Sequence, residues 1–516
     1  MRPVSVRLRE ASSLAALPPR VHRRAAWLGV LVVALALAGP AGAATYLVRP
    51  DGTGDFPTIQ DAIDAATGGD TILLANGVFT GSRNRDLSTI GKAITLRSQS
   101  GSADACIIDC QGSAGDPHRG IAVISSEGSA TVLSGITIRN GYHGTLAGGM
   151  QCSNASPTVT DCVFSECFGE LGGGVACQGT AAPRFIRCRF EADSAGIGAG
   201  AWATNDATPT FEACVFSGNH CRIEAGGISL QYSASVVMRD CVFMDNAGGY
   251  RGGGLLADDN SIVDVTGSTF VSNTSSGGGG AYCCAASRGT FRDCTFQANA
   301  AAQGAQLCCG CMAIATLENC LLTFGIHGAG VHCWSSGEAH LACSDVFGNA
   351  AGDWVGYIAT QAGVEGNISA DPVYCDAAAR DLTLHAGSPC LAGHHPAGYD
   401  CGLIGAWGLG CPSVDTPEDA PSPTAWRLAI AGANPFTGST WIACRVPEAA
   451  RGAALAVFDL AGRRVRSLAP AGLPAGAHRV AWDGNDDFGR PAPAGVYHVR
   501  LTGPGAGLEG RVCRIR

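Results

Sequence analysis

Three aspartates are the residues of this 516-residue chain whose type and spacing come nearest to hydrolytic chemistry. Asp206, Asp258 and Asp259 each follow a segment that reads as a β-strand, and Asp206 stands two sequence repeats before the other two. Strands that stack about 4.8 Å apart would separate two repeats by about 9.6 Å. That distance reaches the upper limit of the separation between the two carboxylates of an inverting glycosidase. Because Asp is also a common turn residue, these three are weak catalytic candidates, and a turn role is the alternative.

Aromatic side chains near these aspartates are the candidate ligand-binding residues. They are Trp202, Tyr232, Tyr282, His332 and Trp334. Exposed rings stack on sugar faces, so a row of them predicts binding of an extended polysaccharide, whereas simple cover of a sheet is the alternative. We expect the row on the outward side of successive strands, at Gln151, Ala176, Trp202, Ser229, Leu256, Tyr282, Leu307 and His332.

The histidines do not have the spacing of a metal site. His327, His332 and His340 lie near Glu338 and Cys333, but neither a His-x-x-x-His nor a paired Cys-x-x-Cys pattern is present. We therefore predict no metal and no cofactor. The whole chain contains one lysine, Lys92, so lysine-based chemistry would have a single candidate.

A repeat of 26 or 27 residues must position these side chains. Self-similarity at a fixed step indicates a solenoid. Each repeat holds short alternating segments and no amphipathic helix, which favours a right-handed parallel β-helix, and we expect about 9 to 11 coils. The repeated motif occurs as Cys162-Val163-Phe164, Cys188-Arg189-Phe190, Cys214-Val215-Phe216, Cys241-Val242-Phe243, Ser268-Thr269-Phe270, Cys294-Thr295-Phe296 and Cys320-Leu321-Leu322.

The recurring residues have packing and turn roles in this interpretation. The cysteines of the motif form one stacked row of buried thiols. Glycine clusters supply positive φ at a corner. Asparagines three residues after the phenylalanine predict a hydrogen-bonded ladder, at Asn219, Asn246, Asn273 and Asn299. A second inward row is expected at Cys152, Cys177, Ala203, Leu230, Ala257, Cys283, Cys308 and Cys333.

Four further cysteines lie beyond the repeats among Gly and Pro. An exported chain can form disulfides, and these are the better candidates for pairing: Cys375, Cys390, Cys401 and Cys411.

Composition divides the chain into four parts. Residues 1–43 carry basic residues, a short apolar run and an A-x-A-like site, which predicts a secretory signal peptide. Residues 44–411 form the β-helix with an N-terminal cap helix and a Cys-rich C-terminal cap. Residues 412–426 are a Pro-rich linker, and residues 427–516 a small Ig-like β-sandwich. A formal charge of −9 argues against nucleic acid as a partner, and no span crosses a membrane once the signal is removed.

Three segments resemble known families. The pairing of glycine clusters with Phe-x-x-Asn, as in Phe216 to Asn219, is similar to bacterial right-handed β-helix repeat proteins, including polymorphic outer-membrane adhesins. The segment from Asp51 to Ile72 resembles the N-terminal cap of pectin-lyase-like proteins, although the paired aspartates of pectin methylesterases have no counterpart downstream. The tail, with Asn434-Pro435-Phe436 and Ala494-Gly495-Val496-Tyr497, resembles the Ig-like domain of flagellar-hook-cap proteins and type IX secretion sorting tails. It departs from them in ending on Arg511-Val512-Cys513-Arg514-Ile515-Arg516, where sorting tails usually carry lysine.

Together these features predict a secreted or bacterial cell-surface protein that binds or adheres to a glycan or another surface without catalysis. The resemblance of the tail implies secretion machinery as a second partner. A polysaccharide lyase or glycoside hydrolase is the alternative, and a purely structural surface-layer element is a third.

Overall fold

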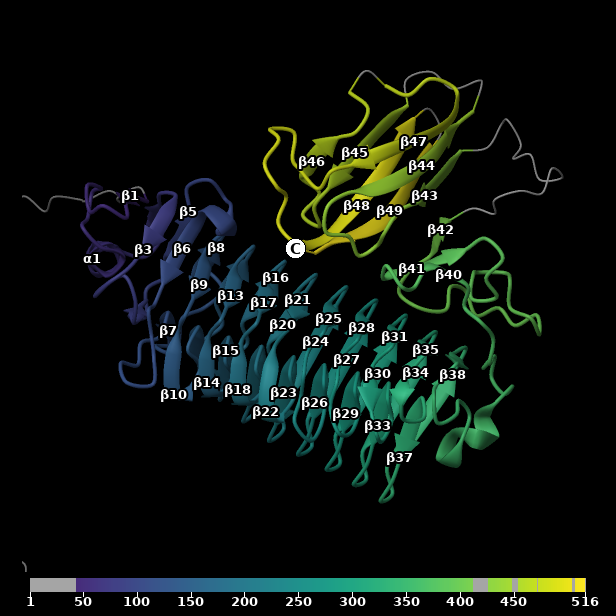
Figure 1. The fold of residues 1–516 in the computed structure, drawn as a ribbon. Helices are drawn as coiled ribbons and strands as arrows, with labels where there is room; N and C mark the ends of the chain where they lie inside the picture. The colour runs from purple at the N-terminus through teal and green to yellow at the C-terminus, as the bar shows by residue number, and fades with distance from the viewer. Residues whose placement is uncertain (1–42, 412–425, 448–452, 471, 504–505, 516) are drawn as a thin grey trace, which may run out of the picture. The chain divides into compact units, whose positions relative to one another are not determined.

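A computed structural model describes residues 43–411, 426–447, 453–470, 472–503 and 506–515 (Figure 1). The predicted signal peptide lies outside the described residues except for Ala43, as does the linker except for Trp426. No helix in the described part of the chain is long and apolar enough to cross a bilayer.

A short helix closes the N-terminal end of the β-helix, as predicted. Helix α1 (Ile59–Ala65) buries Ile59, Ala62 and Ile63, and the Thr58 hydroxyl caps it by accepting from the Asp61 amide at 3.2 Å. At its C-terminal end the Lys92 ammonium donates to the carbonyls of Ile63 (2.8 Å) and Asp64 (2.7 Å). The single lysine therefore stabilises the cap through the orphan carbonyls of the helix.

Parallel strands form the walls of the β-helix, in register from coil to coil (Figure 1). Sheet A is β1 (Thr45–Val48), β2 (Thr71–Leu74), β5 (Thr95–Ser98), β8 (Val132–Ser134), β12 (Thr158–Thr160), β16 (Arg184–Ile186), β20 (Thr210–Glu212), β24 (Ser235–Arg239), β27 (Ile262–Thr266), β30 (Arg288–Arg292), β34 (Ile314–Glu318) and β38 (Glu338–Ala342). Sheet B is β3 (Gly77–Phe79), β6 (Cys106–Asp109), β9 (Thr137–Arg139), β13 (Val163–Ser165), β17 (Arg189–Glu191), β21 (Val215–Ser217), β25 (Val242–Met244), β28 (Thr269–Val271), β31 (Thr295–Gln297), β35 (Leu321–Thr323) and β39 (Asp345–Phe347). A 3-10 turn, η1 (Ala103–Ala105), precedes β6.

Two further groups of strands complete each coil. Sheet C is β4 (Leu87–Ser88), β7 (Ile121–Val123), β11 (Met150–Ser153), β15 (Val175–Gln178), β19 (Ala201–Thr204), β23 (Ile228–Gln231), β26 (Leu255–Ala257), β29 (Ala281–Cys283), β33 (Leu307–Cys309) and β37 (Val331–Cys333). Between sheets B and C run β10 (Tyr142–Leu146), β14 (Phe168–Leu171), β18 (Ser194–Ile197) and β22 (His220–Glu224), which we call sheet D, and the pair β32 (Ala300–Ala301) and β36 (Ile326–His327).

The β-helix has more coils than the predicted 9 to 11. Sheet A alone contains twelve parallel strands. The coils before residue 148 lack the Cys-x-Phe motif, so sequence periodicity did not reveal them.

The core is built from the repeated phenylalanines. Phe190 and Phe216 stack with ring centroids 4.5 Å apart, and Phe216, Phe243, Phe270 and Phe296 continue the stack at 4.6 Å. All of these rings are fully buried. The motif therefore recurs because each ring packs on its copy in the next coil.

The predicted asparagine ladder is present and buried. The Nδ2 atoms of Asn219, Asn246 and Asn273 each donate at 2.9 Å to the Oδ1 atom of the next asparagine in the row. Each also donates to a phenylalanine carbonyl of the preceding coil, as Asn219 does to Phe190 at 2.9 Å. The ladder thus satisfies backbone carbonyls that face the interior at this corner.

The thiol row also forms, but the second inward row needs one correction. The Cys214 thiol donates to the Phe185 carbonyl at 3.4 Å, and the hydroxyl of Ser268 occupies the same place two coils later. In strand β33, Cys308 pairs with Tyr282 and Cys309 with Cys283. The prediction of Cys308 as inward and Leu307 as outward was therefore wrong by one residue, because Gln306 replaces the third glycine of that coil.

Two smaller units follow the coils. The C-terminal cap holds the 3-10 helix η2 (Gly356–Gln361) and the strands β40 (Tyr374–Asp376), β41 (Asp381–His385) and β42 (Leu409–Cys411). The tail has the antiparallel sheets of a small sandwich around a buried Trp482, as predicted. One sheet is β43 (Arg427–Ile430), β44 (Thr440–Val446) and β47 (Gly476–Trp482), and the other is β46 (Arg464–Ser467), β45 (Ala454–Phe458), β48 (Gly495–Gly503) and β49 (Ala506–Arg514).

Candidate functional site

Sheet C brings most of the predicted site residues into two neighbouring rows on its outer side. Strand register gives one row as Gln151, Ala176, Trp202, Ser229, Leu256, Tyr282, Cys308 and His332. The second row stands two residues later in each strand or just past its end, and contains Gln231, Asp258, Cys284, Gly310 and Trp334. Trp202, Tyr282, His332, Trp334 and Asp258 therefore share one face.

That face is covered, which the sequence did not predict. The side chain of Trp202 is 5% exposed and that of Tyr282 is 3% exposed. Trp202 packs with Ala147 and Ala176 against side chains of the sheet D segments. At the corner between those segments and sheet C, glycines such as Gly278 adopt positive φ (61°), so that the chain folds back over the outer side of sheet C. Trp202 and Tyr282 therefore do not form an open row, whereas His332 is partly exposed and Trp334 is 38% exposed at the C-terminal end of this face.

The turns after sheet C hold the remaining candidates. Asp206, Tyr232 and Asp259 have φ of 65°, 52° and 50°, and each belongs to a two-residue left-handed turn that recurs from coil to coil. Asp and Asn adopt this backbone more readily than most residues do. The turn explanation therefore accounts for Asp206 and Asp259. Tyr232 is 59% exposed at this turn.

A continuous polar network crosses the covered face. The Trp202 indole donates to Gln231 Oε1 at 3.0 Å, and Gln231 Nε2 donates to Glu224 Oε2 at 3.1 Å. Arg251 Nε donates to Glu224 Oε1 at 3.0 Å, while Arg251 Nη1 lies 3.0 Å from Asp258 Oδ2. One guanidinium thus holds two buried carboxylates, and this bidentate capacity is particular to arginine.

The charges of this network are set by burial and by the ion pairs. Burial raises the pKa of Asp258, although the Arg251 charge opposes the shift. Burial acts to lower the pKa of Arg251, but its hydrogen bond with Glu224 and the charge of Asp258 outweigh that effect and raise the pKa. Both carboxylates are thus ion-paired with the same cation.

Tyr282 and Trp334 close the C-terminal end of the face. Trp334 Nε1 donates to the Tyr282 hydroxyl at 3.1 Å, and a Cβ at Gly310 would come within 2.3 Å of that indole nitrogen. The absence of a side chain at Gly310 therefore allows Trp334 to reach back two coils. Arg251 Cζ lies 5.9 Å from the centroid of the Tyr282 ring, which is cation–π range.

A hollow of about 300 Å³ opens beside Arg251. Tyr250 stands at its rim with 68% of its surface exposed, and Tyr282 forms part of its wall. The hollow is lined by Tyr250, Arg251, Ser276, Gly277, Tyr282, Ala302 and Gln303. Sequence reasoning missed Tyr250, Arg251 and Glu224. The sequence feature that could have revealed this site is the pair Glu224 and Arg251. These opposite charges stand one period apart and therefore pair across adjacent coils.

The histidines remain dispersed. His340 Nε2 lies 3.2 Å from Glu338 Oε2 at the exposed surface of sheet A, and His332 is partly exposed on sheet C. In the described ranges, no three His, Cys, Asp or Glu side chains gather as a set of metal ligands.

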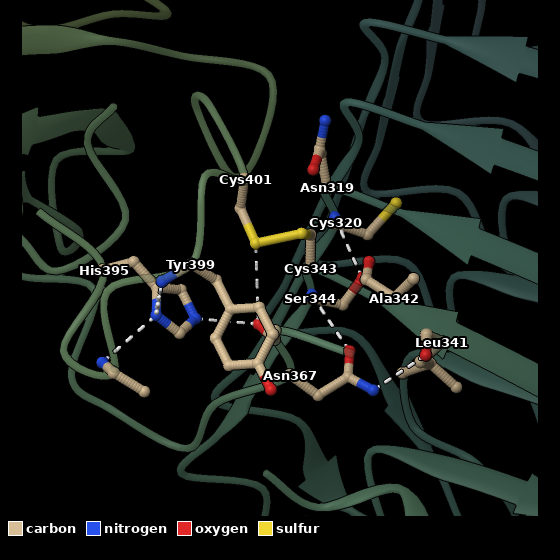
Figure 2. The surroundings of a disulfide bond; sticks show 12 residues. Asn319, Cys320, Leu341, Ala342, Cys343, Ser344, Asn367, His395, Tyr399 and Cys401 are labelled. Carbon is tan, nitrogen blue, oxygen red and sulfur yellow. Dashed lines mark hydrogen bonds between the residues drawn. A yellow bond between two sulfur atoms is a disulfide. The ribbon is translucent and has the colours of Figure 1, made fainter. Parts of the chain in front are cut away.

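Two disulfides stabilise the C-terminal cap, and Cys343 takes the place of the predicted Cys390 in one of them. Cys375 pairs with Cys411, and Cys401 pairs with Cys343, which is the bond drawn in Figure 2. Cys390 is unpaired, and its thiol donates to Asp345 Oδ2 at 3.4 Å. Cys343 was missed because it stands one residue before the position of the motif cysteine, which Ser344 takes in the last coil. It lies instead at the corner position of Asn319, with φ of 46°.

Comparisons with known proteins agree with this architecture. The family model described as a right handed beta helix region matches residues 174–346, and the model of the FlgD Ig-like domain matches residues 431–507. The molecule thus consists of a right-handed parallel β-helix followed by a C-terminal Ig-like domain. No curated protein sequence matches the chain.

Similar solved structures differ in their named activities. They include the pectate lyase Pel9A (TM-score 0.40, 14% identity, 72% of this chain and 97% of that one) and pectin methylesterase from carrot (0.28, 11%, 63% and 88%). Tailspike protein 4 of bacteriophage CBA120 is also similar (0.36, 11%, 86% and 63%). At these scores the likeness does not bear on what this chain does.

Proposed function

We propose that this chain is an exported, surface-associated β-helix protein that binds a glycan without turnover, in the hollow beside Arg251. The observation that supports binding is the set of groups around the hollow. Tyr250 offers an exposed ring for stacking on a sugar, while Arg251 and Gln303 offer hydrogen-bond donors. A volume of about 300 Å³ is at the small end of ligand sites.

The local charge favours an uncharged glycan. Arg251 is neutralised by Glu224 and Asp258, and Asp259 adds a further carboxylate at the adjacent turn. An anionic sugar would meet net negative charge there, whereas a neutral sugar would not. The Ig-like tail, by its similarity to the FlgD Ig-like domain, is the part that we propose serves secretion or anchoring.

The test is a binding series on purified protein with neutral cello-, xylo- and chito-oligosaccharides and with oligogalacturonate. We expect a neutral oligosaccharide to bind, and Tyr250→Ala to weaken it by about tenfold through loss of stacking. Tyr357→Ala, on the exposed surface of η2, is the matched control and should leave affinity unchanged. Tyr232→Ala distinguishes the hollow from the turn. An affinity that responds to Tyr232 and not to Tyr250 would move the site to the turn.

The same set of oligosaccharides also tests whether the protein is instead a polysaccharide lyase or glycoside hydrolase. Reducing ends and the ultraviolet absorbance of unsaturated products are followed over time, in the native protein and in Asp258→Asn and Asp259→Ala. Turnover that either substitution abolishes would refute non-catalytic binding. No retention of any oligosaccharide would leave the structural surface-layer function in its place.

A further inference from the structure

Cys311 differs from every other unpaired cysteine of the described residues. There are 21 such cysteines, and all except Cys311 are buried. Cys311 stands at a left-handed turn (φ 51°) next to Met312, whose side chain is exposed. Cys311 is therefore the member of this set that is partly exposed to solvent.

The turn places Cys311 beside Cys284 of the preceding coil. The Ala286 amide donates to the Cys311 carbonyl at 2.9 Å, which sets the two turns side by side. Cys284 belongs to the second row of sheet C, where the residue in the next coil is Gly310.

The two cysteines are neighbours. Both belong to the apolar cluster formed with Leu256 and Tyr282, and burial, followed by the neighbouring Cys311 thiol, raises the pKa of Cys284. Thiols of the inner row, such as Cys188, Cys214 and Cys241, also stand in adjacent coils, but they are enclosed in the core. Among the described free cysteines, a pair in adjacent coils with one partly exposed member is thus specific to Cys284 and Cys311.

We propose that Cys284 and Cys311 form a third disulfide, which joins consecutive coils when the folded protein meets a small disulfide such as glutathione disulfide. The Cys311 thiolate attacks one glutathione sulfur, and the first glutathione leaves as a thiolate. Cys284 then loses its proton to solvent and attacks the Cys311 sulfur of the mixed disulfide, which releases the second glutathione. The protein gives up two protons and two electrons, and glutathione disulfide is reduced to two thiols.

This bond would hold the edge of the candidate site in place whether or not a glycan is bound. Cys284 lies between Asp258 and Gly310 in the row that ends at Trp334. A cross-link there closes a loop of one coil and restricts the unfolded chain. Burial raises the pKa of Cys284 to about 12. The partly exposed Cys311 is therefore the attacking thiol, and release by Cys284 is the slow step.

The test treats the full chain, with its two disulfides intact, with glutathione disulfide under native conditions, followed by alkylation. Proteolysis after Arg288 and Arg292 separates the two cysteines for mass spectrometry. We expect a peptide containing Cys284 linked to one containing Cys311, two hydrogens lighter than the reduced pair, and loss of Cys311 alkylation.

Two variants make the result specific. Cys311→Ser changes only the exposed turn, and it should abolish the cross-link while the inner thiols stay unreactive. Cys284→Ser should leave a stable glutathione adduct on Cys311. A stable adduct in the unmodified chain, or undiminished alkylation of Cys311 after treatment, would overturn the proposal.

Discussion

Asp193 occupies the place that asparagine takes in the following coils of the ladder. Its backbone amide donates to Asn219 Oδ1 at 3.0 Å, and its Oδ1 accepts from the Cys167 amide at 2.9 Å. The other oxygen, Oδ2, is buried without a hydrogen-bond partner among the described residues. An asparagine there would offer an Nδ2 donor, which in Asn219 bonds the Phe190 carbonyl.

Replacing Asp193 by Asn should therefore stabilise the protein at neutral pH. Burial raises the folded-state pKa of Asp193 well above the ordinary 3.8. The protonated carboxyl is favoured on folding, so its contribution is complete below pH 3.8 and is lost as pH rises toward the folded-state pKa. We expect Asp193→Asn to gain about 1–3 kcal/mol at pH 7 and much less at pH 4, measured by urea unfolding.

Asn246→Asp is the matched control, because it places the same carboxyl in the middle of the ladder. It should lose stability at pH 7 and recover part of it at pH 4. Equal pH slopes for the native chain and Asp193→Asn would contradict this account.

At the scale of elements, the ladder crosses a coil that has no asparagine at the ladder position. Gly325 stands at the ladder position there, and the side chain of Gln306 fills the space from the neighbouring strand. Asn299 Nδ2 donates to Gln306 Oε1 at 2.7 Å, and Gln306 Nε2 donates to Asn349 Oδ1 at 3.1 Å. A Cβ at Gly325 would come within 3.0 Å of Gln306 Nε2. The two positions have therefore exchanged their side chains.

A double-mutant cycle tests this exchange. Gln306→Gly removes the amide that joins Asn299 to Asn349 and should cost about 2–4 kcal/mol. Gly325→Asn alone should also destabilise, since the space is occupied. The double variant restores the arrangement of the other coils. Its loss of unfolding free energy should therefore be much smaller than the sum of the losses in the two single variants. Additive losses would show that Gln306 does not substitute for the asparagine.

At the scale of the whole molecule, the C-terminal cap should be more stable against local unfolding at acidic pH than at alkaline pH. Burial raises the pKa of Asp345 to about 7 and that of Asp381 to about 6. Both carboxyls favour the protonated form in the folded cap. Their contribution is therefore present below the ordinary pKa of 3.8 and is lost as pH rises through about 6 to 7.

Hydrogen exchange over residues 343–411 measures this effect. We expect lower protection at pH 8 than at pH 5 after correction for the intrinsic rate, with at most about 4 kcal/mol from Asp345. Asp345→Asn keeps an acceptor for the Ala370 amide, which donates to Asp345 Oδ1 at 3.0 Å, and removes the titration. That variant should match the native chain at pH 5 and exceed it at pH 8. A cap whose protection is independent of pH in both proteins would refute the prediction.

The sequence by itself determined the side chains that stack from coil to coil. A strict step of 26 or 27 residues forces Phe216 onto Phe190 and Asn246 onto Asn219, because identical side chains in register must pack on their copies. The cap helix was equally visible, since Ile59, Ala62 and Ile63 have helical spacing. These are constraints within one coil or between adjacent coils, and periodicity reports them directly.

Only the tertiary structure decided what covers each face and which distant residues meet. Trp202 and Tyr282 lie on the outer side of sheet C, yet the folded-back segments bury them, and alternation cannot distinguish a covered face from an open one. The pairing of Glu224 and Asp258 with Arg251, and of Cys343 with Cys401, depends on contacts between segments that differ in sequence from coil to coil. The period fixes the scaffold, whereas the site arises from side chains that depart from it.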